Sequence, residues 1–355
     1  MGTAGVAVTP QTVDSENTVL AFTHDQTAAD HAEYSVQFHA QSTCDLLMVA
    51  GGGGGGTVEF FGTSGTGAGG GGGGVIFLQN LAVSAGSYDI KVGKGGEGDD
   101  YSDMTQRTGR NGFKSTFSYL LTEAVGGGGG GSRTFNSGPN DHDNTLGHNG
   151  GSGGGSNYKE AGDGDPAASA SGSNNGGHGT VSDILKYDGT TVLRANYRQG
   201  YNGGLGEHYM PYSSGGGGAG GNGYGPDSSN QNNLQYLNPT SSDGGIGRAE
   251  ENGLDFKTYF NIQSSIGQHH TDSKVYFAGG GSSGFRQDEY NVGGLGGGGD
   301  STNTESIVHG MMHTGGGGAG ARSGGASNAI TPTATLINGG NGGSGVVVLK
   351  CRASV

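Results

Sequence analysis

Short apolar segments recur along the chain, and most of them alternate between apolar and polar positions. Tyr88, Ile90 and Val92 show this period of two plainly, whereas Leu46 to Val49 is a continuous apolar run typical of an inner strand. No stretch shows a sustained helical periodicity. The pattern therefore predicts an all-β fold, with strands at 18–23, 33–39, 44–50, 75–80, 87–92, 113–119, 274–278 and 346–351.

Glycine tracts separate these segments, and glycine supplies 84 of the 355 residues. Glycine-rich sequence usually forms flexible linkers. The alternative is a bundle of polyproline-II-type helices made of glycine, with three residues per turn, which can pack closely because no Cβ intervenes. The bundle is favoured because tracts of similar length recur and several begin or end directly on strands. The tracts are 51–56, 69–74, 126–131, 215–221, 293–299, 315–320 and 339–345.

The chain divides into a first segment, 1–50, whose strands feed a sheet, and a second segment, 51–355, in which a polyglycine-II helix bundle is interleaved with strands. We expect the two to form one intertwined domain, with the glycine tracts emerging from one end of the β-structure. This arrangement predicts where the loops lie, because each tract must run either away from the sheet or back toward it.

The direction of each tract follows if outward and returning tracts alternate strictly. Tract 51–56 leaves strand 44–50 and runs outward, whereas tract 69–74 enters strand 75–80 and returns. Continued along the chain, the alternation gives 126–131, 215–221, 279–281 and 315–320 as outward, and 150–155, 244–247, 293–299 and 339–345 as returning. The loops expected together at the far end are then 57–68, 132–149, 222–243, 282–292 and 321–338.

Composition narrows the class of function. A hydrophobic content of 30% is low, yet 15 Tyr and 12 Phe argue against a disordered chain. The net charge of -14 and scattered basic residues exclude a nucleic-acid partner. No run of about 18 apolar residues predicts membrane insertion, and the N-terminus has no secretory leader pattern.

Sequence motifs give no support for catalysis. The G-x-G-x-x-G matches do not lie between a strand and a helix, and no phosphate-binding loop motif or nucleophile elbow is found. His309 and His313 are four residues apart without the glutamate of a zinc-protease motif, and His269 and His270 are interpreted as loop residues. We predict no enzyme activity, no metal and no cofactor. Calcium is the minor alternative, at the acidic group Glu97, Asp99, Asp100 and Asp103.

An ordered set of blocks carries a family resemblance that extends from about Tyr34 to the C-terminus. The chain resembles the glycine-rich domain of phage tail-fibre and algal-virus surface proteins, including the tip adhesin of T-even-type long tail fibres. It is also similar to the glycine-rich domain of anaplastic lymphoma kinase-type receptors. The resemblance implies a small jelly-roll or tumour-necrosis-factor-like β-sandwich, and host attachment or virion structure. The blocks are CDLLMVAGGGGGG, LAVSAGSYDIKVGKGGEG, FKSTFSYLLTEAVGGGGGG, SKVYFAGGG, GGLGGGG and NGGNGGSGVVVLK.

The two cysteines, Cys44 and Cys351, lie in the first strand that feeds a tract and the last strand that a tract enters. They could bridge if these strands are neighbours, or remain as two buried free thiols. The resemblance to virion proteins assembled inside cells favours the free thiols.

Aromatic and charged residues in the expected far-end loops are the candidate binding site. Tyrosine beside arginine and asparagine gives a rigidly mounted surface a large contact area at low entropy cost. Phe60, Phe61 and Phe135 have an alternative role, which is to cap the bundle and exclude water. The full candidate set is Phe60, Phe61, Arg133, Phe135, His142, Tyr224, Tyr236, Phe285, Arg286, Asp288 and Tyr290.

These features together predict a protein of the virion surface or extracellular space that displays binding loops for a host surface glycan or protein. The alternative is an architectural virion component, such as a capsid decoration, vertex or fibre protein, whose partners are other virion proteins. An ice-binding protein would need a flat, regular face, which irregular loops do not provide.

Overall fold

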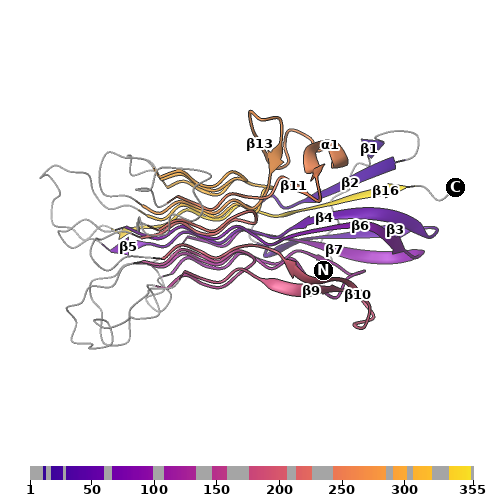
Figure 1. Cartoon of the computed structure of the whole chain (residues 1–355), viewed down its shortest axis with the longest axis horizontal. Helices are drawn as coiled ribbons and strands as arrows, with labels where there is room; N and C mark the ends of the chain where they lie inside the picture. The colour runs from indigo at the N-terminus through magenta and orange to yellow at the C-terminus, as the bar shows by residue number, and fades with distance from the viewer. Residues whose placement is uncertain are drawn as a thin grey trace, which may run out of the picture.

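Antiparallel strands occupy one end of the molecule, and extended glycine tracts run from them to the other end (Figure 1). Within the described residues the one helix is α1 (Phe256–Phe260), so the predicted all-β class is confirmed. The computed structural model describes residues 11–12, 17–26, 29–59, 66–98, 108–132, 146–157, 176–205, 213–225, 243–284, 291–301, 307–321 and 336–352.

The larger sheet has the strand order β1-β2-β16-β4-β6. Its strands are β1 (Gln11–Thr12), β2 (Asn17–Thr23), β4 (Ser42–Val49), β6 (Val75–Val83) and β16 (Val346–Arg352). The last strand of the chain is central, because Val348 lies opposite Ala21 of β2 and Leu47 of β4. Residues from both ends of the sequence therefore build one sheet.

A smaller sheet, of order β3-β7-β8, packs on one face of the larger one. It contains β3 (His31–Phe38), β7 (Gly86–Gly93) and β8 (Thr116–Phe117). Ile90 and Phe117 share a buried core with Leu46, Met48 and Leu349. The alternation along β7 places Ile90 and Val92 in this core, as its period of two requires.

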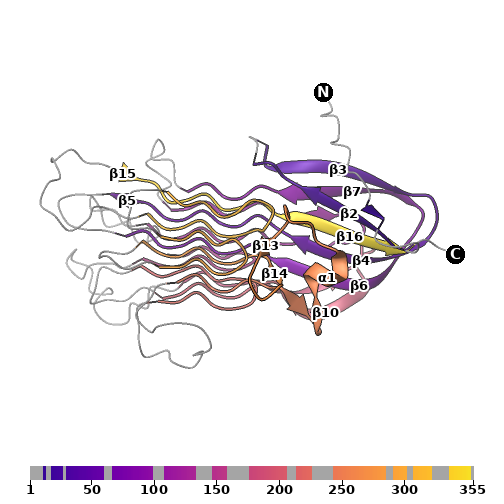
Figure 2. The same ribbon diagram turned by 90° about the horizontal axis from the view of Figure 1, so that it is seen from above.

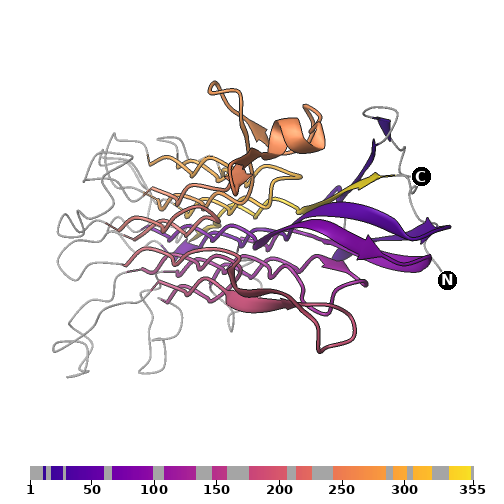
Figure 3. The ribbon, with the colours of Figure 1, turned by 45° about the vertical axis from the view of Figure 1, so that its right-hand side comes forward.

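The opposite face of the larger sheet is covered by α1. Phe256 and Phe260 are fully buried against Phe77 and Phe277. Asp255 caps the helix by accepting the Thr258 N–H at 3.0 Å. Short pairs lie beside it, β11 (Glu250–Glu251) with β12 (Leu254–Asp255), and β13 (Gln268–His269) with β14 (Val275–Tyr276) (Figure 3).

Most predicted strands are confirmed within two or three residues. The predicted strand 113–119 is reduced to β8, because its ends are held by turn and bridge contacts. The hairpin of β9 (Val181–Leu185) and β10 (Val192–Arg198) was not predicted, since its residues show no clear apolar alternation. Helix α1 was also missed, because five residues are too few to display a helical period.

The glycine tracts run side by side along the molecule (Figure 2). Their backbone hydrogen bonds repeat every third residue, so the tracts are ordered. In tract 51–56, Gly51 and Gly54 donate to carbonyls of segment 108–113 at 3.0 and 2.9 Å. Gly52 and Gly55 donate in the same way to 339–345, and Gly53 and Gly56 to 67–74. The carbonyls of the tract accept from 93–98, 126–131 and 315–321. This tract is therefore surrounded by neighbours on every side, and they exclude side chains from it.

Exposed asparagines complete the hydrogen bonding at the surface of the bundle. The Asn111 side-chain oxygen accepts the Gly129 N–H at 2.9 Å, and that of Asn341 accepts the Gly98 N–H at 2.9 Å. Asn149, Asn202 and Asn222 do the same for His178, Gly179 and Asn202 at 2.7 to 3.1 Å. In each case the side chain replaces the carbonyl that a further tract would supply. All five asparagines precede glycine.

The strict alternation of tract directions is wrong at several tracts. Gly128 donates to Ser152 and Gly131 to Gly155, so 150–155 runs parallel to the outward tract 126–131 instead of returning. Likewise, Gly69 donates to Ser214 and Gly72 to Gly217. Segment 213–219 is therefore parallel to the returning tract 69–74.

The alternation fails because the chain reverses within glycine-rich sequence as well as at strands. Segment 146–150 is the missed return, with His148 donating to Gly129 at 2.9 Å before the chain turns at 150–151. Tract 293–299 contains a similar turn at 295–297.

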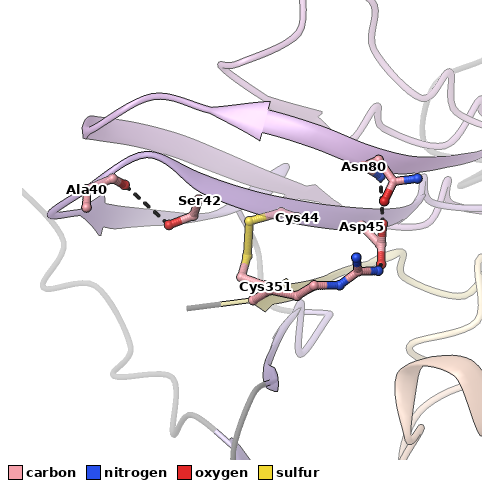
Figure 4. Close-up of a disulfide and its surroundings, with 7 residues drawn as sticks. Ala40, Ser42, Cys44, Asp45, Asn80 and Cys351 are labelled. Atoms are coloured by element: carbon pink, nitrogen blue, oxygen red, sulfur yellow. Dashed lines mark hydrogen bonds and ion pairs between the residues drawn. A yellow bond between two sulfur atoms is a disulfide. The ribbon is translucent and has the colours of Figure 1, made fainter. Parts of the chain in front are cut away.

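Cys44 and Cys351 form a disulfide, so the expectation of free thiols is wrong (Figure 4). The two residues lie directly opposite each other in the β4–β16 register, which brings their side chains to the same face. Beside them, Asp45 accepts the Asn80 N–H at 2.7 Å and lies 3.5 Å from the Arg352 guanidinium. The bridge joins the start and the end of the glycine-rich sequence.

Candidate functional site at the far end of the bundle

The far end is the end of the glycine tracts remote from the two sheets. Strand β5 (Val58–Glu59) pairs there with β15 (Leu336–Ile337), which joins the predicted loops 57–68 and 321–338 (Figure 2). Thr57 donates its N–H to the Ser132 hydroxyl at 2.8 Å, and Gly284 donates to the Gly67 carbonyl at 3.0 Å. These contacts bring the described flanks of four predicted loops to one place.

The fifth predicted loop, 222–243, has its Asp243 flank in the same region. Asp243 is buried, and its Oδ1 accepts the Val292 N–H at 2.7 Å, which ties this loop to loop 282–292. Thr66 accepts a hydrogen bond from the Ser213 hydroxyl at 3.0 Å. Each of the five predicted loops therefore has a described flank at the far end. Residues 146–149 and 222–225, predicted as parts of two loops, are instead segments of the bundle that adjoin turns at 150–151 and 219–221.

Of the predicted binding residues, only Tyr224 falls within the described part of the chain. It is half-buried, and its backbone donates to the Asp243 carbonyl at 3.0 Å and accepts from Gly215 at 2.9 Å. Burial, with a smaller contribution from Asp243, raises the pKa of the Tyr224 hydroxyl. The residues that lie outside the described ranges are Phe60, Phe61, Arg133, Phe135, His142, Tyr236, Phe285, Arg286, Asp288 and Tyr290.

Buried serine and threonine side chains close the far ends of the tracts. The Ser214 hydroxyl donates to the Gly204 carbonyl at 2.7 Å and accepts the Ser156 N–H at 2.8 Å. The Ser213 hydroxyl donates to the Gly67 carbonyl at 2.8 Å. Because these hydroxyls are bonded to the backbone, they hold the tract ends in place and are poor candidates for nucleophiles. A serine directly after a glycine run, as at Ser132 and Ser156, was a signal available in the sequence.

The match to a known family covers both ends of this architecture. A glycine-rich domain family model matches residues 27–352, which include the strands of both sheets from β3 onward and the whole bundle. The chain belongs to the glycine-rich domain family. No curated protein matches the sequence.

The other candidate side chains of the glycine-rich domain each have local partners. His309 Nδ1 accepts the Asn341 N–H at 2.9 Å, whereas His313 Nδ1 lies 3.2 Å from the Ser265 carbonyl. Glu97 pairs with Lys94 at 2.9 Å, and the acidic residues Asp99, Asp100 and Asp103 lie outside the described ranges. Among the described residues, no three His, Cys, Asp or Glu side chains are grouped to hold a metal ion.

The described part of the glycine-rich domain also contains no helix with the length and apolar character needed to cross a bilayer. Its longest apolar segments are strands of the buried sheet, such as β4 and β16.

Proposed function

We propose that the protein is a virion-surface adhesion protein that displays loops on a rigid scaffold for attachment to a host surface glycan or protein. The observation that carries this proposal is the grouping of the loop flanks at one end. The described ends of the chain, β1 and β16, lie in the sheet at the other end (Figure 1). This polarity suits a protein held at its sheet end with its loops directed outward.

A rigid mount favours binding because little conformational freedom is lost when a ligand is bound. The flanks of the loops are fixed by buried hydrogen bonds such as Thr57 to Ser132 and Asp243 to Val292. Loops distant in sequence can then present one combined surface. Tyr224 is the candidate contact whose backbone position is known, and it is anchored on both its N–H and its carbonyl.

The proposal includes a finer description of the fold. We assign the glycine tracts to polyglycine-II helices, supported by hydrogen bonds that repeat every three residues, the period of the polyproline-II conformation. We assign the strand end to a small jelly roll of the tumour-necrosis-factor type, supported by the five-stranded and three-stranded antiparallel sheets that share a core.

The Cys44–Cys351 disulfide supports an extracellular place of action, because such bonds persist in oxidising surroundings. An architectural role in the particle is the alternative. It would direct the far end against other virion proteins, and the orientation on the particle therefore separates the two functions.

Two antibody fragments test this orientation on intact particles that carry the protein. One is raised against residues 226–240, between described flanks at the far end, and the matched control against residues 187–191, the exposed turn of the β9–β10 hairpin. We expect the first fragment to label intact particles and block attachment to host cells. We expect the control fragment to leave attachment unchanged.

Labelling by the far-end fragment only after particle disruption would refute attachment and favour the architectural role. Failure of either fragment to label any particle protein would refute a virion location. Alanine substitution of Tyr224, Tyr236 and Arg286 together gives an independent measure. We expect the substituted protein to lose attachment and to melt within a few degrees of the wild type, because the anchoring bonds of the half-buried Tyr224 are made by its backbone.

A further inference from the structure

A groove lies where the bundle meets the strand end, away from the far-end loops. Its volume is about 320 Å³, within the range of roughly 300 to 1,000 Å³ that is usual for small-molecule sites. We call it the junction groove. It is lined by Tyr201, which follows β10, by Tyr276 of β14, and by the segment from Ile246 to Glu250.

The middle of the lining consists of small residues. Ala219, Gly220 and Gly247 contribute only backbone and methyl groups there, and a ligand can approach the main chain at the exposed Gly220. The backbone is fixed, because Ala219 donates to the Ala278 carbonyl and Gly220 to the Ile246 carbonyl, both at 2.9 Å. The groove is therefore a formed feature of the fold that does not need to assemble on binding.

Both tyrosine rings of the groove are held by neighbouring side chains. The Arg198 guanidinium lies 4.9 Å from the centre of the Tyr201 ring, and the Tyr276 hydroxyl donates to Asp272 at 2.8 Å. The His270 ring meets Tyr276 edge-on at 5.9 Å. Two fixed aromatic surfaces beside a floor of small residues suit a ligand with flat apolar faces, at a low ordering cost.

The charged groups in the lining are held by ion pairs. Lys274 Nζ lies 2.5 Å from Glu250 Oε2, and Arg248 shares Glu251 with Arg194 and also donates to the Tyr197 hydroxyl at 2.8 Å. The lining thus offers both hydrogen-bond donors and acceptors. With a net charge of -14 on the whole chain, an anionic ligand is disfavoured.

We propose that the junction groove binds a neutral saccharide unit of a surface glycan, at a site separate from the far-end loops. A sugar ring has an apolar face of C–H groups that packs on tyrosine, and a rim of hydroxyls that both donate and accept hydrogen bonds. Tyr201 and Tyr276 supply the first kind of contact, and Lys274 with Glu250 supplies the second. A purely aromatic ligand would use the rings and make no hydrogen bond to Lys274 or Glu250.

Saturation-transfer NMR and titration calorimetry on the full chain test this site. The probes are the methyl glycosides of glucose, galactose, mannose and N-acetylglucosamine, because a methyl glycoside mimics a sugar linked within a glycan. We expect at least one glycoside to bind wild-type protein, and Tyr201→Ala or Tyr276→Ala to weaken that binding about tenfold or more. Lys274→Met tests the polar contact without removing a ring.

Tyr187→Ala is the matched control, since Tyr187 is 57% exposed on the β9–β10 turn and does not line the groove. It should bind as the wild type does, and all variants should melt within a few degrees of it. Absence of binding to every glycoside, or unchanged binding in the three groove variants, would overturn the proposal. If free sugars bind but their methyl glycosides do not, a glycan ligand is excluded. If phenol binds more strongly than every glycoside, the groove is assigned to aromatic ligands.

Glycoside binding in the junction groove does not depend on the proposed attachment through the far-end loops. Alanine substitution of Tyr224 should leave glycoside binding in the groove unchanged. A loss there would show that the observed saccharide binds at the far end and would overturn the assignment to the groove.

Discussion

Replacing Gly128 with alanine tests the close packing of the bundle with the smallest possible change. An added Cβ at Gly128 would lie 1.9 Å from the His148 carbonyl oxygen and 2.8 Å from the Gly154 nitrogen. Ordinary van der Waals contact begins at 3.4 Å, so the His148 segment would have to move by 3.4 minus 1.9, or 1.5 Å. The atoms in the way belong to the backbone, so no side-chain rotation relieves the clash.

The energetic effect follows from the hydrogen bonds that such a movement breaks. Gly128 donates to Ser152 at 2.8 Å and accepts from Gly71 at 2.7 Å, while the His148 carbonyl accepts from Gly154 at 3.0 Å. Each lost bond costs about 1 kcal/mol, and a buried group left unpaired costs about 1 to 3. For the three bonds the sum is roughly 3 to 9 kcal/mol, a large part of the unfolding free energy of about 5 to 15 kcal/mol of a typical domain.

Gly221→Ala is the matched control for Gly128→Ala. Its new Cβ would lie 3.1 Å from Ile246 Cγ2 and 3.9 Å from the Ile246 nitrogen, so a shift of a few tenths of an ångström relieves the contact. Thermal and urea unfolding of the two variants would be followed by circular dichroism. We expect Gly128→Ala to be insoluble or strongly destabilised, Gly128→Val to fail to fold, and Gly221→Ala to remain within about 1 kcal/mol of wild type. Wild-type melting of Gly128→Ala would refute the packing argument.

Three further perturbations have defined outcomes. Asn222→Ala should lower the unfolding free energy by about 0.5 to 1.5 kcal/mol, because it removes one bond to the bundle edge; an unchanged urea midpoint would contradict this. Cys44→Ser with Cys351→Ser should lower the melting temperature of the oxidised protein and abolish its sensitivity to reductant, because the bridge spans a sequence separation of 307. Burial lowers the pKa of His24 and His148 below 6.5, so the unfolded state binds more protons below that pH. The unfolding free energy should be highest above pH 6.5 and fall on acidification, with a smaller fall in His148→Gln.

The strands of the buried sheet could be predicted from sequence because their apolar residues are consecutive or alternate along the chain. Val346 to Leu349 follows glycine directly and is apolar at every position, as a strand covered on both faces must be. Helix α1 could not be predicted, because its helical state depends on packing. Phe256 and Phe260 are both fully buried against residues far away in the sequence, and five residues alone carry no periodic signal.

The direction of each tract could not be predicted from strand junctions alone. A glycine run can reverse direction without a strand. The chain does so at 219–221, where the Gly218 N–H donates to the Gly221 carbonyl at 2.8 Å. Asparagine gives a usable local signal for the edges of the bundle, since Asn111 and Asn341 are exposed residues within glycine-rich sequence and bond to a neighbouring tract. The partner of each asparagine still depends on the tertiary arrangement.

The same packing that makes the tracts predictable also restricts where the protein can vary. An added Cβ at Gly53 would lie 2.2 Å from the Gly128 carbonyl, and one at Gly54 would lie 2.1 Å from the Glu97 carbonyl, so substitutions within the tracts disrupt several neighbours at once. Most of the candidate binding residues of the proposed attachment function lie in the sequence between the tracts. If the protein attaches to a host surface as we propose, a change of specificity should therefore come from substitutions in this sequence, because substitutions within the tracts would disrupt the fold.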